Sequence, residues 1–115
     1  MTLPTTLKHI ASETEYKEVI AQHQNVMICC GRMGPMCVPV YQAMTELENR
    51  YTHIEFRDMA FDAPDAHVIR NLPECNGFMG LPFTVYYKNG EVIKATSGLQ
   101  TKDQVQQILD EYFGA

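Results

Sequence analysis

The chain has 115 residues, of which 45% are hydrophobic and 20% charged, and its formal net charge is -5. This length and balance are typical of one folded domain with its own core, and they exclude a disordered chain. The acidic charge and the lack of a Lys/Arg cluster exclude a nucleic-acid-binding role. The sequence also contains neither a membrane span nor a signal peptide, so we expect a cytoplasmic protein.

The first half of the sequence predicts strands and helices in alternation. Residues 7–10 form a short edge strand, and Ser12 opens a capping box before a helix that runs to about Gln22. The continuous apolar run 26–30 predicts a central strand that is buried on both faces. A long second helix follows, because apolar residues recur at helical spacing at Val40, Met44, Leu47 and Tyr51.

The second half of the sequence continues this alternation. Pro64 opens a short helix over 65–71, and Asn89-Gly90 predicts a tight hairpin turn between two strands. A second capping box at Thr101 opens a C-terminal amphipathic helix. The remaining predicted strands begin at Ile54 and cover 84–87 and 92–95. The pattern therefore predicts one α/β domain over residues 1–115.

Two motifs give this order of elements a family resemblance. Arg32-Met33-Gly34-Pro35-Met36-Cys37 follows the central strand, and Gly80-Leu81-Pro82-Phe83 precedes a later one. The sequence resembles the thioredoxin-like family, whose members carry Trp-Cys-Gly-Pro-Cys and a Gly-Ile/Val-Pro-Thr segment with a cis proline at these places. The resemblance implies a thioredoxin fold, with a central mixed sheet of four or five strands and about four flanking helices.

The same resemblance shows what this chain lacks. When Gly34-Pro35 is matched to the family's Gly-Pro, the two redox cysteines are replaced by Met33 and Met36, and a thioether neither ionises nor exchanges with a disulfide. Arg32 replaces the family's tryptophan, and the family's buried strand aspartate has no counterpart in the central strand. The standard dithiol reaction is therefore excluded, and any disulfide oxidoreductase activity must use other cysteines.

The four cysteines leave several possibilities open. A second alignment matches the apolar residues of the predicted second helix instead of the Gly-Pro pair. In it, Cys37 takes the place of the family's resolving cysteine and Gly34 that of the nucleophile. A bridge between Cys30 and Cys37 is possible if their Cα atoms come within about 7 Å; otherwise Cys29 and Cys30 are small core residues. Cys75, in a segment expected to be more exposed, could instead approach Cys37.

The resemblance also implies a peptide-binding groove. In the family, the residue before the cis proline offers its backbone to an extended peptide, and here that residue is Leu81, before Pro82. Methionines make adaptable binding surfaces, so Met33 and Met36 could serve this groove after the loss of the redox pair. Other expected lining residues are Phe78, Met79 and Leu81, whereas Met27, Met44 and Met59 are expected in the core.

Three hypotheses follow for the function. The first is a role in thiol-disulfide redox homeostasis centred on Cys37, working alone or with Cys30 or Cys75. The second is a redox-inactive module that binds an extended peptide or partner protein. The third is Cu(I) binding by the soft Cys/Met loop, although the spacing matches no zinc pattern and no cofactor is expected. We expect a monomer or weak dimer, with a protein or peptide client, and scattered histidines (His9, His23, His53 and His67) on the solvated surface.

Overall fold

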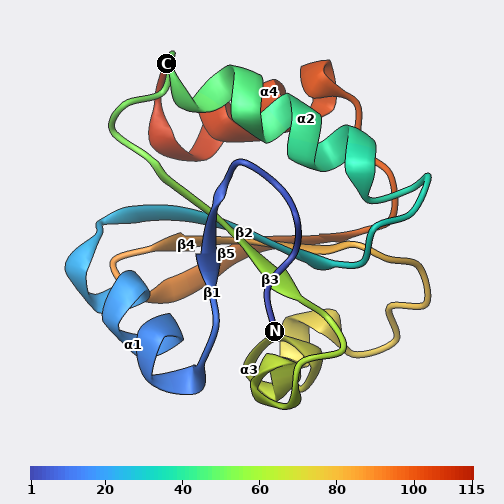
Figure 1. Ribbon diagram of the computed structural model, residues 1–115. Helices are drawn as coiled ribbons and strands as arrows, with labels where there is room; N and C mark the ends of the chain where they lie inside the picture. The colour runs from blue at the N-terminus through green and yellow to red at the C-terminus, as the bar shows by residue number, and fades with distance from the viewer.

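A computed structural model describes residues 1–115 as a five-stranded mixed sheet between two pairs of helices (Figure 1). The strand order is β1-β3-β2-β4-β5. Strands β1, β3 and β2 are parallel to one another, β4 is antiparallel to β2, and β5 is antiparallel to β4. The long buried strand β2 lies at the centre, as its continuous apolar run predicts. The strands are β1 (Lys8–Ile10), β2 (Asn25–Gly31), β3 (Glu55–Ala60), β4 (Phe83–Lys88) and β5 (Glu91–Ser97).

Four helices cover the two faces of the sheet. Helices α2 (Val38–Glu48) and α4 (Lys102–Phe113) lie above it in Figure 1, and α1 (Glu13–Gln22) and α3 (His67–Arg70) lie below it. The thioredoxin fold expected from the sequence is thus confirmed in strand number and in helix number. No helix of the structure combines the length and the hydropathy needed to cross a membrane.

Local sequence signals explain where the helices begin. The capping box predicted at Thr101 is complete, since Thr101 and Gln104 each accept a backbone N–H of the other. At α1 only half of the predicted box forms: Ser12 accepts the N–H of Glu15, but the Glu15 carboxylate accepts the N–H of Ala11 instead. The predicted helix over 65–71 is shorter than expected, because its first turn is a 3₁₀ turn at Pro64–Ala66 and α3 is only four residues long.

The core consists of two clusters that the sheet separates. Because successive side chains of a strand point to opposite faces, Met27 and Cys29 of β2 pack toward α2 and α4, whereas Ile28 and Cys30 pack toward α1 and α3. The hairpin turn between β4 and β5 has the conformation predicted for it, with positive φ at Asn89 and at Gly90.

Candidate functional site

The candidate site lies where β2 ends and two loops meet beside it. Gly31 is the last residue of β2, and the loop 32–37 leads from it into α2. A Cβ atom placed on Gly31 would lie 2.7 Å from the Tyr41 hydroxyl, 2.9 Å from the Cys37 sulfur and 3.0 Å from Cβ of Pro82. The peptide bond before Pro82 is cis. Only a residue without a side chain fits at this junction, so Gly31 brings both predicted motifs into contact.

The loop after β2 is held at its first residue. The guanidinium group of Arg32 donates two hydrogen bonds of 2.8 Å to the Asp62 carboxylate, and it lies 5.4 Å from the centre of the Phe61 ring. These hydrogen bonds lower the pKa of the Asp62 carboxyl group. The Tyr41 hydroxyl donates a 3.0 Å hydrogen bond to the backbone oxygen of Arg32. Arg32 thus anchors the loop to the segment after β3.

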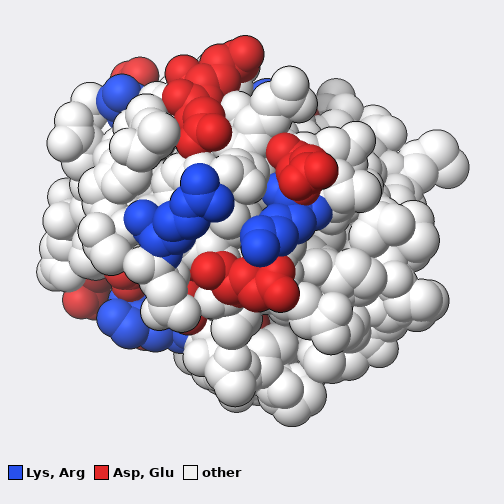
Figure 2. Space-filling model, turned by 90° about the horizontal axis from the view of Figure 1, so that it is seen from above, with Lys and Arg blue, Asp and Glu red and all other residues white.

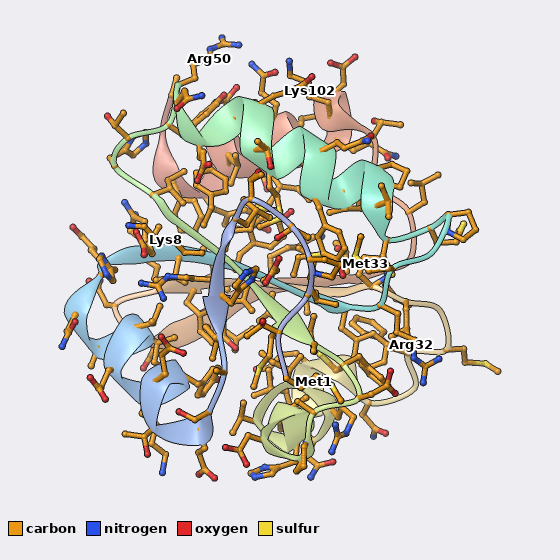
Figure 3. All side chains as sticks on the ribbon, in the orientation of Figure 1. Met1, Lys8, Arg32, Met33, Arg50 and Lys102 are labelled. Atoms are coloured by element: carbon orange, nitrogen blue, oxygen red, sulfur yellow. The ribbon has the colours of Figure 1, made fainter.

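Three methionines expose their side chains around this junction. Met33 is 48% and Met36 49% exposed on the first loop, and Met79 is 97% exposed on the segment before Pro82. The two loops lie at the same end of the sheet (Figure 1), and Figure 3 places Met33 and Arg32 there. The face of this end that is visible in Figure 2 carries no charged side chain. The three expected core methionines, Met27, Met44 and Met59, are fully buried.

The segment before Pro82 presents unused backbone groups. Gly80 uses both of its groups on the Ser97 hydroxyl, since its N–H donates to that oxygen at 3.2 Å and its carbonyl accepts at 2.6 Å. The backbone oxygen of Pro82 accepts from Gly98 at 3.0 Å. Between these fixed points, neither the N–H nor the carbonyl of Leu81 is hydrogen-bonded within the chain. Leu81 therefore offers one donor and one acceptor at the edge of the site.

The structure does not bring the predicted cysteine pair together. Cys30 packs with Cys75 in the cluster beneath the sheet, whereas Cys37 packs with Cys29 in the cluster above it, and all four thiols are free. The alternation of side chains along β2 points Cys30 away from α2, which explains this separation. The expectation of an exposed Cys75 is wrong, because 3₁₀ turn Pro73–Cys75 directs the side chain into the core and leaves it 3% exposed.

Burial makes most of these thiols poor nucleophiles. It raises the pKa of Cys30 to about 12 and that of Cys75 to about 11, and it holds the pKa of Cys29 well above the ordinary value. Cys37 is also only 3% exposed, but its sulfur accepts a hydrogen bond from the backbone N–H of Arg32 at 3.5 Å. Cys37 is the one cysteine that directly precedes α2 and contacts the loop.

A buried carboxylate was missed by the sequence analysis. Asp58 on β3 is fully buried, and it accepts hydrogen bonds from the Thr5 hydroxyl at 2.5 Å and from Nδ1 of His9 at 2.6 Å. It lies beside Cys29 of β2 in the sheet. Burial raises the pKa of Asp58, although both hydrogen bonds oppose this shift. The expectation of a solvated His9 holds only in part, because its side chain is 29% exposed and bonds to this buried carboxylate. The alternation of β3 was the only signal in the sequence that Asp58 is buried.

A hollow of about 510 Å³ adjoins the loop on the α2 side. Met33, Val38 and Tyr41 form its apolar wall, and Thr5, Thr6 and Gln42 supply polar groups. Met33 is the only predicted site residue in it. No group of three or more His, Cys, Asp or Glu side chains is placed to hold a metal ion.

Comparison with known structures identifies the fold. Thioredoxin from Plasmodium falciparum is 21% identical and superposes with a TM-score of 0.77 over 92% of this chain and 99% of its own. For mitochondrial thioredoxin 3 from Saccharomyces cerevisiae the identity is 19%, the TM-score 0.75 and the coverage 92% of this chain and 95% of that one. For thioredoxin f2 from Chlamydomonas reinhardtii the values are 12%, 0.78, 95% and 98%. No family model and no curated protein matches the sequence. The chain has the thioredoxin fold.

Proposed function

We propose that this protein binds an extended segment of a client protein across the end of the sheet where Gly31 contacts Pro82. The observation that carries the proposal is the set of three exposed methionines on two anchored loops around that contact. Large apolar side chains are rarely left exposed together on a monomer surface unless something binds there. Methionine is also suited to clients of varied sequence, because its side chain is flexible and polarizable.

The client is expected to be extended because of the backbone at Leu81. Its free N–H and carbonyl can pair with one residue of a peptide strand, which is how strand addition gives affinity without sequence specificity. Side chains at alternate positions of that strand would then face Met33 and Met79. The hollow beside Met33 has room for one client side chain. The exposed methionine side chains favour apolar client side chains.

The proposal is tested with an array of synthetic decapeptides whose alternate positions carry Leu, Val, Phe, Lys or Glu. Peptides with apolar alternate positions should bind, and binding should shift the Leu81 amide signal in an NMR titration and protect that amide from exchange. Methylation of the peptide nitrogen that faces Leu81 should weaken binding, because it removes one hydrogen bond at a cost of about 1 kcal/mol, or roughly fivefold.

A matched pair of variants locates the site. Met79→Lys should abolish binding because it places a charge in the apolar contact, whereas Met1→Lys changes another exposed methionine, outside the two loops, and should leave binding intact. Equal effects of the two variants, or a peptide whose binding leaves the Leu81 amide unchanged, would refute the proposal.

A second candidate function is thiol-disulfide exchange through Cys37. It is favoured by the position of Cys37, which directly precedes α2 and whose sulfur accepts a hydrogen bond from the Arg32 N–H. In this reaction the Cys37 thiolate attacks a client disulfide, forms a mixed disulfide and releases the other client sulfur as a thiolate; an external thiol then releases Cys37. Four free cysteines fit a reducing compartment, and a cytoplasmic location is part of this proposal.

Thiol titration separates the two candidates. If Cys37 exchanges, the native protein should form a mixed disulfide with glutathione disulfide that maps to Cys37, is reversed by dithiothreitol and is absent from Cys37→Ser. A bridge between Cys30 and Cys37 in the oxidised protein would instead require β2 to rearrange and would restore the pairing considered from the sequence. Absence of any adduct would leave peptide binding as the sole function.

A further inference from the structure

The sulfur atoms of this protein are distributed unevenly between core and surface. All four cysteines are at most 3% exposed, and three of the seven methionines are fully buried. The exposed sulfur atoms are therefore all thioethers, at Met33, Met36 and Met79 around the candidate site and at Met1 outside it. An oxidant that reaches this protein from solvent meets methionine before it meets a thiol.

The two loops that carry the three site methionines are each held to the rest of the fold by hydrogen bonds. The first loop is fixed by the paired hydrogen bonds between Arg32 and Asp62. The second is fixed at Gly80 by the Ser97 hydroxyl, which accepts from its N–H and donates to its carbonyl. Met33 directly follows the first anchor and Met79 directly precedes the second, while Met36 lies further along the first loop.

We propose that Met33, Met36 and Met79 form an oxidation site at which hydroperoxides switch off client binding. The thioether sulfur attacks the hydroxyl oxygen of the hydroperoxide, an S–O bond forms and the O–O bond breaks; the proton of the attacked oxygen passes to the other oxygen, which leaves as water or an alcohol. Sulfur loses two electrons and the peroxide gains them. Methionine sulfoxide reductases reverse the change with electrons from thiols, so the site can be restored.

This inference rests on the proposed peptide-binding function. A sulfoxide is polar and chiral, and it replaces a flexible apolar group in the contact surface. Burying its oxygen against an apolar client without a hydrogen bond costs roughly 1–3 kcal/mol. We therefore expect oxidation to weaken peptide binding by about tenfold to a hundredfold.

The test combines site mapping with a binding measurement. The protein is treated with dilute hydrogen peroxide, and each methionine is followed by tandem mass spectrometry while free thiols are titrated; fragmentation assigns the sulfoxide within the tryptic peptide 33–50, which holds Met33, Met36 and Met44. Sulfoxide should accumulate at Met33, Met36 and Met79 while the core methionines stay unmodified and all four thiols still titrate. The apolar decapeptide selected from the array should lose affinity in step with this modification, and methionine sulfoxide reductase should restore it.

Variants distinguish the switch from general damage. The triple variant Met33→Leu, Met36→Leu, Met79→Leu has no oxidisable sulfur at the site, so the ratio of its decapeptide affinities before and after peroxide treatment should stay near one, whatever its affinity before treatment. Met1→Leu should remain as sensitive as the original protein. Thiol loss before methionine oxidation, or full binding after complete sulfoxidation of the three residues, would overturn the inference. Failure of the untreated protein to bind any decapeptide would refute the proposed function and with it the switch, and the mapping would separate that outcome from a failure of the three methionines to react.

Discussion

The contact between Gly31, α2 and the proline segment makes Gly31→Ala the sharpest structural test. The added methyl group would meet three different neighbours at once: the Tyr41 hydroxyl at 2.7 Å, the Cys37 sulfur at 2.9 Å and Cβ of Pro82 at 3.0 Å. Atoms other than hydrogen that are not bonded to each other avoid such distances, so at least one neighbour must move. Gly31 has no positive φ, so this cost is steric and not conformational.

The expected loss of stability can be worked out from these contacts. Overpacking by one methyl group in a filled core costs about 1–3 kcal/mol. If Tyr41 is the group that moves, its hydrogen bond to the Arg32 carbonyl is lost as well, at a further cost of about 1 kcal/mol. We therefore expect Gly31→Ala to lower the free energy of unfolding by roughly 2–4 kcal/mol.

Urea unfolding followed by circular dichroism measures this change, and Gly34→Ala is the matched control. Gly34 lies three residues further on, in the loop that follows β2, and has no positive φ; a Cβ there would meet no atom within 4 Å. The free energy of unfolding of Gly34→Ala should stay within about 0.5 kcal/mol of that of the original protein. Gly31→Ala should also cost less in a Tyr41→Phe background, which removes the closest contact. Equal stability of the two alanine variants would refute the packing argument.

Further predictions concern the titrating groups and the loop anchor. Because burial raises the pKa of Cys30 from 9.0 to about 12, the folded chain keeps a proton that the unfolded chain releases, so stability should fall as the pH rises above 9. In urea titrations at pH 9 to 11, Cys30→Ala should make this fall shallower by about 1.4 kcal/mol per pH unit, and an unchanged slope would contradict the burial argument. Asp58 also has a raised pKa, so its ionisation should remove stability as the pH rises from the ordinary value of 3.8 through the raised one. The stability of Asp58→Asn relative to the original protein should therefore increase from pH 3 to pH 7, and the opposite trend would show that the bonds from Thr5 and His9 outweigh desolvation. Arg32→Ala removes an exposed ion pair and should cost under about 1 kcal/mol of stability, yet it should speed exchange of the Met33 amide measured by NMR.

Most of the fold could be predicted because its signals are local. Helix starts at Ser12 and Thr101 follow from capping residues, and the hairpin follows from Asn89-Gly90, whose positive φ angles suit few other residue pairs. The short segment over 65–71 was predicted less well, since a single turn beginning at a proline satisfies the patterns of a 3₁₀ turn and of an α-helix equally.

The candidate site could be predicted only in part, because it depends on which face each residue takes. Met33, Met36 and Met79 are exposed in loops that the sequence marks by glycine and proline. Whether Cys30 can pair with Cys37 depends on the face of β2 to which Cys30 points. The sequence does not reveal that face, because β2 is apolar on both sides. Asp58 was missed for the related reason that its partners, Thr5 and His9, lie about 50 residues away in the sequence.

The geometry of the first loop and the side chains of positions 33 and 36 depend on different parts of the chain. The geometry depends on Gly31, on the contact with Pro82 and on the anchor between Arg32 and Asp62. Met33 and Met36 are 48% and 49% exposed, so replacing their side chains should cost little stability. A variant with cysteine at both positions, Met33→Cys with Met36→Cys, should keep its free energy of unfolding within about 1 kcal/mol when reduced, and Ellman titration should find two additional reactive thiols. A large loss of stability would show that the methionines support the loop, contrary to their exposure.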